Sequence, residues 1–204
     1  MARPYHHGNL KEALLQAAVE LVGEAGPSGF TLRELARRAG VSHNAPYRHY
    51  KDREALLAEV ACQGFEELVG AIYAAVSKES EPLGQFRAAG RAYVKFALRR
   101  PEHYAVMFDR MPEEPDPYPQ RTQAAERAFD SLVQLVVLSQ AAGAIVEDDS
   151  EMLARQAWAL CHGIAKLGIG GFLKTSKASE ILAFTDATIQ SALIGLVPKS
   201  GTKA

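Results

Sequence analysis

The sequence predicts an all-α protein of about nine helices in two units, residues 1–52 and 53–204. Apolar residues recur every three or four positions in long stretches, the spacing that gives a helix one apolar face. Glycine, proline and short polar residues stand where these helices are expected to begin and end. No segment alternates apolar and polar residues with the period of a strand. The composition, 48% hydrophobic and 23% charged, is typical of a globular protein with a sizeable core.

The first helix is expected over 9–25, where apolar residues form a single stripe that ends at Gly26-Pro27. It is expected to pack behind two short helices that follow, because helices of their length are not stable alone. Asp52 is placed to cap a long fourth helix that extends to about residue 76. No flexible linker interrupts this helix, so we expect the first unit to be joined to the second by continuous helix.

Between these helices lies the most informative stretch, 30–53, with the sequence FTLRELARRAGVSHNAPYRHYKDR. Thr31 is a good helix cap, and Glu34 three residues later completes a capping box. Gly40 accepts the left-handed backbone that closes a helix, and Ser42 can cap a second, very short and polar helix. A helix, a tight turn and a second helix with polar residues is the arrangement by which helix-turn-helix proteins enter the major groove of DNA.

Pro46 leaves two geometries open for this second short helix. Proline is tolerated in the first turn of a helix, but it disfavours α geometry at the preceding residue, Ala45. Either Pro46 lies in the opening turn, or the helix starts later than the spacing of the polar residues suggests. The identity of the side chains that face the bases depends on which geometry is correct.

The ends of the later helices are marked in the same way. Pro82 opens the fifth helix, which stops at Pro101, and the proline-rich acidic segment 111–119 is expected to be a mobile surface loop. Gly143 ends the seventh helix, and the acidic run 148–151 suits the positive end of the eighth. The expected ranges are 82–99, 103–110, 120–142, 150–174 and, from Ser176 or Ser179, to about 197.

The charge is distributed unevenly along the chain. Residues 1–53 carry 8 Lys/Arg against 5 Asp/Glu, a net charge of +3, and four of the six histidines. The remaining residues carry 15 basic and 19 acidic side chains, a net charge of −4. A basic first unit on an acidic second unit indicates a protein that contacts nucleic acid at one end only.

The polar residues of the first unit fall into two chemical groups. Tyr47 and His49 can donate to phosphate oxygens, and Lys51 and Arg53 lie at the start of the long helix, where a DNA strand would pass. Arginine pairs bidentately with guanine and asparagine with adenine, and a small apolar residue can touch a thymine methyl group. The residues expected to read bases are Arg33, His43, Asn44 and Ala45, with Arg48 as a further candidate.

A resemblance to the TetR/AcrR family of bacterial transcriptional regulators is carried by Gly40-Val41-Ser42, Tyr47-Arg48-His49-Tyr50 and Lys51-Asp52-Arg53. It extends over 10–57, and it departs from the family pattern at Asn44-Ala45-Pro46. The resemblance implies that Thr31, Tyr47 and Arg53 face phosphates. The full set expected to contact DNA is Thr31, Arg33, Ser42, His43, Asn44, Ala45, Tyr47, Arg48, His49, Lys51 and Arg53.

A second motif, Trp158-Ala-Leu-Cys-His162-Gly163, places Trp158 and His162 on one helical face. It resembles the Trp-x-x-x-His-Gly signature of one C-terminal subtype of the same family. The pair either holds its helix against a neighbour or lies at the edge of an effector pocket, and both interpretations remain open. Aromatic and methionine side chains favour an apolar ligand. The expected ligand-binding residues are Phe65, Phe96, Tyr104, Met107, Phe108, Phe129, Trp158 and His162.

The resemblance implies a homodimer in which the last two helices of each copy form a four-helix bundle. It further implies binding to a pseudo-palindromic double-stranded DNA operator, and a repressor that a small-molecule effector releases. Two other functions remain open. One is a helical ligand carrier or enzyme with a vestigial first unit, against which the charge asymmetry argues. The other is a DNA-binding regulator without an effector, acting constitutively or as an activator.

The sequence lacks the patterns of several other functional classes. It has no recognisable catalytic constellation or phosphate-binding glycine loop, so no catalytic residue is expected. Cys62 and Cys161 lack metal-ligand spacing, so we expect reduced thiols, no metal and no cofactor. The absence of a signal sequence and of a long apolar run favours a cytoplasmic protein without membrane spans.

Overall fold

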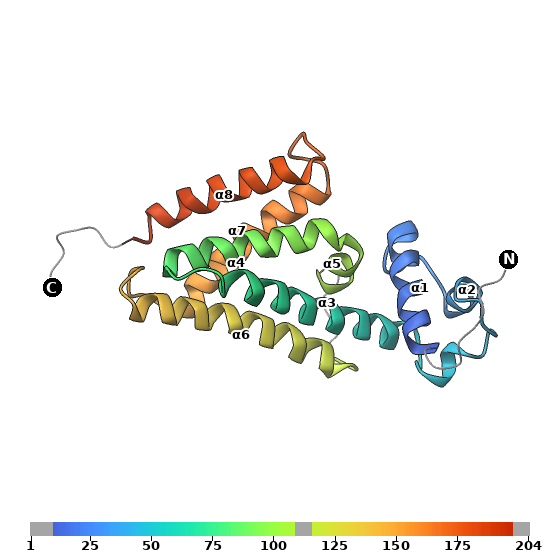
Figure 1. Cartoon of the computed structure of the whole chain (residues 1–204). Helices are drawn as coiled ribbons and strands as arrows, with labels where there is room; N and C mark the ends of the chain where they lie inside the picture. The colour runs from blue at the N-terminus through green and yellow to red at the C-terminus, as the bar shows by residue number, and fades with distance from the viewer. Residues whose placement is uncertain (1–9, 109–115, 198–204) are drawn as a thin grey trace. The chain divides into compact units, whose positions relative to one another are not determined.

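The computed structural model describes residues 10–108 and 116–197, and throughout these ranges the regular structure is helical, as expected (Figure 1). The chain forms two compact units, Met1–Gly64 with Pro101–Ala124, and Phe65–Arg100 with Ala125–Ala204. The expected boundary after residue 52 falls within the first unit and stays a prediction. The helices are α1 (Leu10–Ala25), α2 (Leu32–Arg38), the 3-10 helix η1 (Pro46–Arg48), α3 (Arg53–Val76), α4 (Pro82–Arg99), α5 (Pro101–Phe108), α6 (Pro119–Ala141), α7 (Ser150–Ile169) and α8 (Ala178–Ile194).

The first unit has one apolar core to which each of its early elements contributes. The apolar stripe of α1 packs on α2 and on the beginning of α3, with Phe30 and Tyr50 entering from the connecting loops. Ala105 and Val106 of α5 pack against the same core. The core residues are Leu14, Leu15, Ala17, Ala18, Leu21, Val22, Phe30, Leu32, Leu35, Tyr50, Leu56, Leu57 and Val60.

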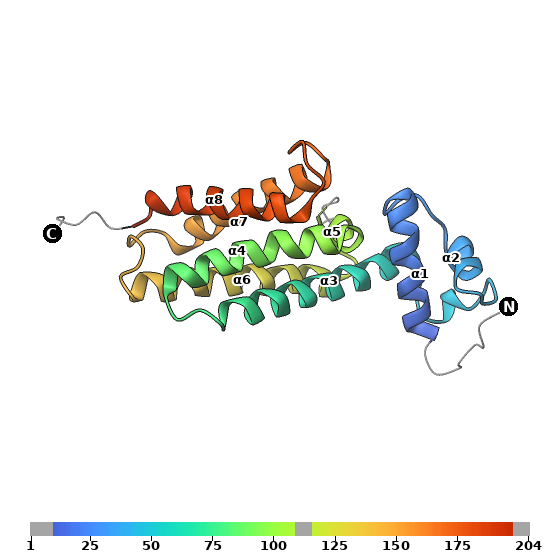
Figure 2. The same ribbon diagram turned by 45° about the horizontal axis from the view of Figure 1, so that its top comes forward.

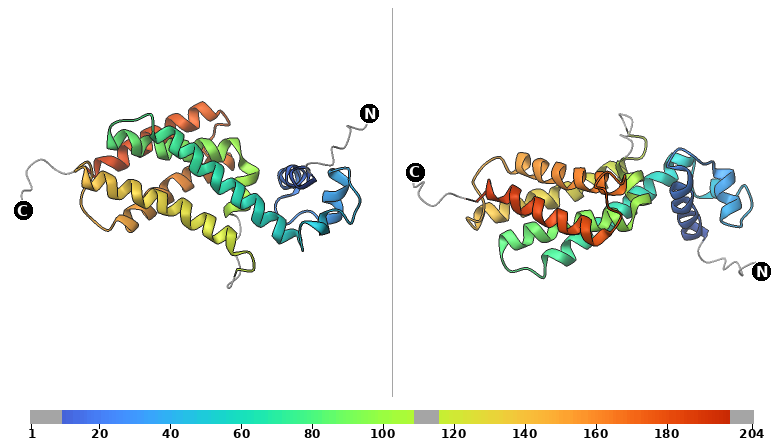
Figure 3. Two further views of the ribbon diagram at one scale, coloured as in Figure 1. Left: turned by 60° about the horizontal axis from the view of Figure 1, so that its bottom comes forward. Right: turned by 90° about the horizontal axis from the view of Figure 1, so that it is seen from above.

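The second unit is organised around α4, which packs on both α7 and α8. Figure 2 shows α4 beside α8, and the right-hand view of Figure 3 shows α7 and α8 side by side. Gly90 permits this packing, because a Cβ there would lie 2.6 Å from Cδ1 of Ile189 and 3.0 Å from Sγ of Cys161. Arg91 adds an ion pair with Asp186 on α8. In the part of the chain that the structure describes, no helix combines the length and the apolarity needed to cross a membrane.

Most of the local helix signals operate as the sequence predicts. The backbone N–H of Glu34 donates to the Thr31 hydroxyl at 3.2 Å, and that of Ala55 donates to the Asp52 carboxylate at 2.8 Å. Gly40 and Gly143 have φ of 69° and 67°, the left-handed backbone that ends α2 and α6. These ends follow from hydrogen bonds within a few residues, which is why sequence alone identifies them.

Three expected elements, the second short helix, the sixth helix and the eighth helix, are wrong in extent. The second short helix is a three-residue 3-10 helix, Pro46–Arg48, and it lacks the expected Ser42 side-chain cap. The carbonyl of Ser42, rather than its hydroxyl, accepts a hydrogen bond from Ala45 N–H at 2.9 Å. Pro46 occupies the opening turn, the first of the two geometries left open, and the chain turns too tightly there for an α-helix.

The eighth expected helix, 150–174, is shorter, because α7 ends at Ile169. Gly171 has φ of 74°, and Phe172 N–H donates to the Leu167 carbonyl at 2.9 Å, which closes the helix in a Schellman motif. The sixth expected helix begins earlier, at Pro101, because proline opens it. Residues 111–115 of the expected loop lie outside the described residues.

Two helical glycines of the second unit should respond oppositely to alanine. At Gly70 on α3, nothing lies within 4 Å of the position that an alanine methyl group would take, so Gly70→Ala should raise the free energy of unfolding by up to about 1 kcal/mol. Gly90→Ala gains the same helix propensity but overpacks against Ile189 and Cys161, so a net loss of roughly 1–3 kcal/mol is expected. Urea unfolding at constant m-value measures both, and equal stabilisation by both would contradict the close packing at Gly90.

Candidate nucleic-acid interface

The end of α2, η1 and the loops beside them present a group of exposed polar side chains. Arg33, on α2, is exposed, as are Ser42, His43 and Asn44, which precede η1. Tyr47 on η1 has 53% of its surface exposed, although large aromatic side chains are usually buried. Arg48, His49 and Lys51 complete the exposed set. The structure thus brings together most of the residues expected to contact DNA.

Beneath this exposed set, η1 is held by buried residues. Ala45 is 7% exposed, Pro46 is fully buried, and Tyr50 is 3% exposed with its hydroxyl donating to Glu59 on α3 at 3.1 Å. Burial raises the pKa of Tyr50, and the neighbouring Glu59 raises it further. The burial of Ala45 corrects its expected role, because a side chain packed in the core is not available to touch a thymine methyl group.

Arg53 also has a different place from the one expected. Its guanidinium donates to the carbonyl oxygens of Ser28 at 2.9 Å and Phe30 at 3.2 Å, and it pairs with Glu54 at 3.2 Å. These bonds tie the beginning of α3 to the loop that leads into α2. The Arg53 guanidinium is therefore engaged in holding α3 to this loop, and Arg53 is not among the residues proposed to bind phosphate.

Some cationic side chains of the first unit bind other groups of the same unit, and others are exposed without an ion pair to any described residue. Arg38 donates to both carboxylate oxygens of Glu24, at 2.8 and 2.6 Å, and so joins α2 to α1. This hydrogen bond lowers the pKa of Glu24. Among the described residues, no carboxylate pairs with Arg33, Arg48 or Lys51, which leaves these three charges for a partner. The hydroxyl of Thr31 accepts from Glu34, and its own proton remains available to a phosphate oxygen.

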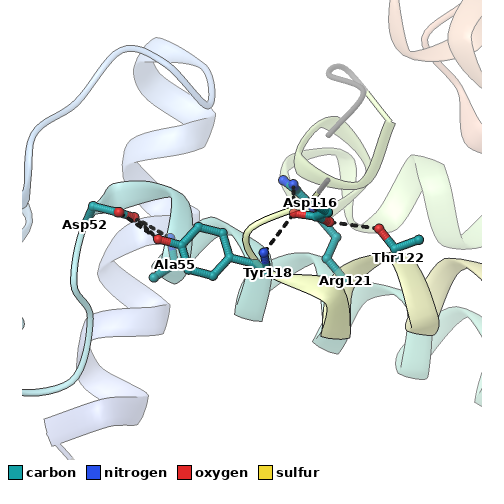
Figure 4. A network of polar contacts seen from close by, with 6 residues as sticks. All are labelled: Asp52, Ala55, Asp116, Tyr118, Arg121 and Thr122. Atoms are coloured by element: carbon teal, nitrogen blue, oxygen red, sulfur yellow. Dashed lines mark hydrogen bonds and ion pairs between the residues drawn. The ribbon is translucent and has the colours of Figure 1, made fainter. Parts of the chain in front are cut away.

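The start of α3 makes a further contact that the sequence did not reveal (Figure 4). The hydroxyl of Tyr118, just before α6, lies 2.7 and 2.6 Å from the two carboxylate oxygens of Asp52. Partial burial opposes ionisation of Asp52, but the bond from Tyr118, the Ala55 N–H and the Lys51 charge together lower its pKa. The same bond, with partial burial, raises the pKa of Tyr118 to about 12.

In the second unit, the side chains of Trp158 and His162 both lie within hydrogen-bond distance of the Tyr93 hydroxyl. Trp158 Nε1 donates to the Tyr93 hydroxyl at 3.2 Å, and that hydroxyl lies 3.1 Å from Nδ1 of His162. Phe129 lies edge-on to Trp158 at a centroid distance of 6.1 Å. Sequence reasoning missed Tyr93 as a partner, because a tyrosine at helical spacing on an apolar face is typical of a core position.

The other expected ligand-binding residues are distributed over both units. Phe65 and Phe96 are buried in the second unit, whereas Tyr104 and Met107 are buried in α5 of the first. Phe108 packs on Tyr104 at 4.9 Å between ring centroids. The grouping of all eight residues around one ligand stays a prediction. Within the described ranges, no cluster of three or more His, Cys, Asp or Glu side chains is arranged to hold a metal ion.

Comparison with known proteins gives two family matches. Residues 14–60 match the N-terminal family described as bacterial regulatory proteins, tetR family, and residues 86–192 match the tetracyclin repressor-like C-terminal domain. The second match begins within α4 and ends within α8, but its description does not mention the expected Trp-x-x-x-His-Gly subtype, which stays a prediction.

Individual proteins are similar over different lengths. The class C tetracycline repressor of Escherichia coli is 43% identical over 51 residues, which are 25% of this chain and only 23% of that repressor. An uncharacterised helix-turn-helix regulator of Bacillus subtilis, YobS, is 23% identical over 92% of this chain and 94% of its own length. A solved protein of unknown function from Rhodococcus sp. RHA1 is 38% identical over 97% of this chain and all of that one, with a TM-score of 0.81.

Replacement of Arg53 should test its role in holding α3 to the loop before α2. Arg53→Ala removes two bonds to backbone carbonyls and should lower the free energy of unfolding by about 1–2 kcal/mol. Arg53→Lys keeps the charge but not the planar fork, so it should recover only part of the loss. Lys51→Ala, at an exposed neighbour, is the control and should change stability by less than about 0.5 kcal/mol in denaturant unfolding. Equal effects of Arg53→Ala and Lys51→Ala would show that the Arg53 bonds contribute nothing.

Proposed function

Because the chain belongs to the TetR family of bacterial regulatory proteins and is a DNA-binding transcriptional regulator, we propose that it acts as a dimeric repressor released by a small molecule. The observation that carries this proposal is the group of exposed polar and cationic side chains around η1, mounted on a buried core. Selection of bound fragments from random DNA with the purified protein tests it directly, since recovery of a recurrent inverted repeat is expected.

We propose that some of the exposed residues read bases and that others contact phosphates. Asn44 is exposed just before η1 and can pair bidentately with adenine, while Arg33 can reach guanine. Tyr47, His49 and Lys51 are proposed to contact phosphates, which sets register without reading sequence, and Arg48 stays a further candidate for base reading. Ser42, His43 and Thr31 remain in the proposed interface, because each is exposed and carries a hydrogen-bonding side chain.

A dimer formed through α7 and α8 is supported by apolar residues that a single chain leaves exposed. Leu167 on α7 is 44% exposed, and Phe184 and Ile194 on α8 are 47% and 72% exposed. Ala159 on α7 and Ala187 on α8 are also exposed, and small residues let a second pair of helices approach closely. An interface core with few charged residues and several large apolar ones is typical of homodimers.

The proposed effector is apolar or aromatic and binds beside Phe129 and Trp158. Trp158 is 37% exposed, and its N–H already donates to the Tyr93 hydroxyl. The hydrogen bonds of Trp158 and His162 to Tyr93 support a structural role for the pair as well. We propose that the Tyr93 bonds hold the two rings in place and that the exposed part of the indole contacts the effector.

The operator should be a pseudo-palindrome bound by a dimer. One η1 with its neighbours offers few contacts, which are too few for the roughly 10⁻⁸–10⁻¹¹ M affinity of specific sites. Two symmetric copies should protect half-sites about one helical turn apart, ~34–36 Å. Footprinting combined with the mass of the complex in solution measures both properties. A monomer protecting one asymmetric half-site would contradict the dimer.

Asn44→Ala should relax discrimination at one base pair in each half-site by about 1–3 kcal/mol. Affinity for random duplex should stay nearly constant, because the phosphate contacts are unchanged. Lys51→Ala is the matched variant, and it should weaken binding to all sequences and lower the slope of log affinity against log salt concentration by about one. Competition binding against single-base operator variants measures both, and an equal loss for operator and random DNA would remove Asn44 from the base-reading set.

The effector should compete with DNA reciprocally. We expect an apolar aromatic compound to change the fluorescence of Trp158, the single tryptophan, and to weaken operator binding by about 1–3 kcal/mol. Saturation with operator should then weaken binding of the compound by the same factor. Titration of the compound with and without operator provides the measurement. A Trp158→Phe variant that releases operator at an unchanged compound concentration would show that Trp158 is structural only.

A further inference from the structure

The carboxylate of Asp52 has two partners that come from different parts of the first unit. Its Oδ1 accepts the Ala55 N–H at 2.8 Å and thereby caps α3. The Tyr118 hydroxyl lies 2.7 Å from Oδ1 and 2.6 Å from Oδ2, so it bridges the two oxygens of the same carboxylate (Figure 4). A hydrogen bond to an ionised acceptor is about twice as strong as one between neutral groups.

Tyr118 is itself held firmly, so its hydroxyl is not free to follow Asp52. Its backbone N–H donates to Asp116 Oδ1 at 2.9 Å. Asp116 is fixed in turn by Arg121 at 2.9 Å and by the Thr122 hydroxyl at 2.8 Å. The side chains of Arg121 and Asp116 are only 13% and 8% exposed. The ion pair at the beginning of α6 is therefore mostly shielded from solvent and holds the backbone at Tyr118, whereas an exposed ion pair would contribute little.

The segment between η1 and α3 is short and carries an exposed lysine between two fixed points. Tyr50 fixes one end through its buried ring and its bond to Glu59. Asp52 fixes the other end through α3 and Tyr118. Lys51, between them, is exposed and has no carboxylate partner among the described residues. The position of its ammonium group, and of η1 just before it, depends on both anchors.

We propose that Tyr118 is a positioning residue of the DNA interface, which holds Lys51 and η1 in their binding arrangement through its hydrogen bonds to Asp52. The inference rests on the DNA-binding function and assigns a role to a residue outside the segment that contacts DNA. Without the bridge, the segment gains freedom that DNA binding must then remove, and affinity falls for every sequence. Tyr118 immediately precedes α6, which continues beyond Ala124 into the second unit and carries Phe129.

The bridge also accounts for the ionisation of the two groups. The Tyr118 bond helps to lower the pKa of Asp52, and the pKa of Tyr118 is raised to about 12. Because the folded pKa of Asp52 lies below its unfolded value, its contribution to stability is complete at neutral pH. That contribution is lost as the pH falls through the lowered pKa. The bridge is therefore fully formed at physiological pH.

Tyr118→Phe removes only the hydroxyl and leaves the backbone bond to Asp116 intact. We expect this variant to bind a fixed random-sequence duplex and the selected operator about three- to tenfold more weakly, with the same factor for both. Tyr73→Phe is the matched control, because Tyr73 is 74% exposed on α3, and its affinity should equal that of the wild type. Circular dichroism at the assay temperature must show fully folded protein, so that the affinity reports positioning and not stability.

A double-mutant cycle with Asp52→Asn tests the route of the effect. Asparagine still caps a helix but carries no charge, so α3 should persist. We expect Tyr118→Phe to weaken DNA binding by a smaller factor in the Asp52→Asn background than in the wild type, because an amide oxygen accepts the Tyr118 hydroxyl more weakly than a carboxylate does. The carboxyl NMR titration of Asp52 should move to higher pH in Tyr118→Phe, which a purely structural role elsewhere would not produce.

Unchanged or tighter DNA binding by folded Tyr118→Phe would overturn the proposal, as would additive effects in the cycle. A wild-type protein that selects no DNA fragments at all would instead overturn the function on which the proposal rests. The two failures are distinct, because the first requires a wild-type protein that binds.

Discussion

The burial of the turn around η1 on the α1–α3 core is the constraint on which the surface proposed to face DNA depends. A seven-residue helix and a three-residue 3-10 helix have too few internal hydrogen bonds to be stable alone. Ala45, Pro46 and Tyr50 supply the missing stability by placing their side chains in the core. The polar neighbours of these residues are consequently left on the outer side, where they are exposed and fixed in place.

Charged side chains serve two opposite purposes in the first unit. Arg38 and Arg53 use their hydrogen bonds internally, on Glu24 and on the backbone of the loop before α2. Arg33, Arg48 and Lys51 remain exposed. An exposed cation gains little from a surface carboxylate, but it gains much from a phosphate backbone because counterions are released. The same residue type therefore builds the scaffold at one position and belongs to the proposed binding surface at another.

In the second unit, α4 holds α7 in two ways, by close packing at Gly90 and by hydrogen bonds at Tyr93. The absence of a side chain at Gly90 brings α4 close to α7 and α8, and Tyr93 on the same helix binds Trp158 and His162 of α7. Exposed apolar residues remain on α7 and α8, whose buried faces already pack on α4. A pair of helices that forms a dimer needs one face packed within its own chain and an exposed apolar face for its partner, and α7 and α8 have both.

The sequence by itself determined the all-α class, those helix ends that depend on local hydrogen bonds and backbone angles, and the segment proposed to face DNA. Thr31, Gly40, Asp52 and Gly143 act through hydrogen bonds or backbone angles within a few residues, and such local physics can be read from spacing. Most of the exposed interface residues follow from the same local pattern together with the family resemblance.

Only the tertiary structure decided which side chains turn inward. Ala45 is buried, and Arg53 is bound to the backbone of the loop between α1 and α2, more than twenty residues earlier in the chain. Tyr93 and Tyr118 find partners 69 and 66 residues away in the chain. Such contacts depend on how whole helices pack, which no periodicity within one helix specifies. The 3-10 geometry at Pro46 is intermediate, because proline signals a tight turn but tertiary burial selects which one forms.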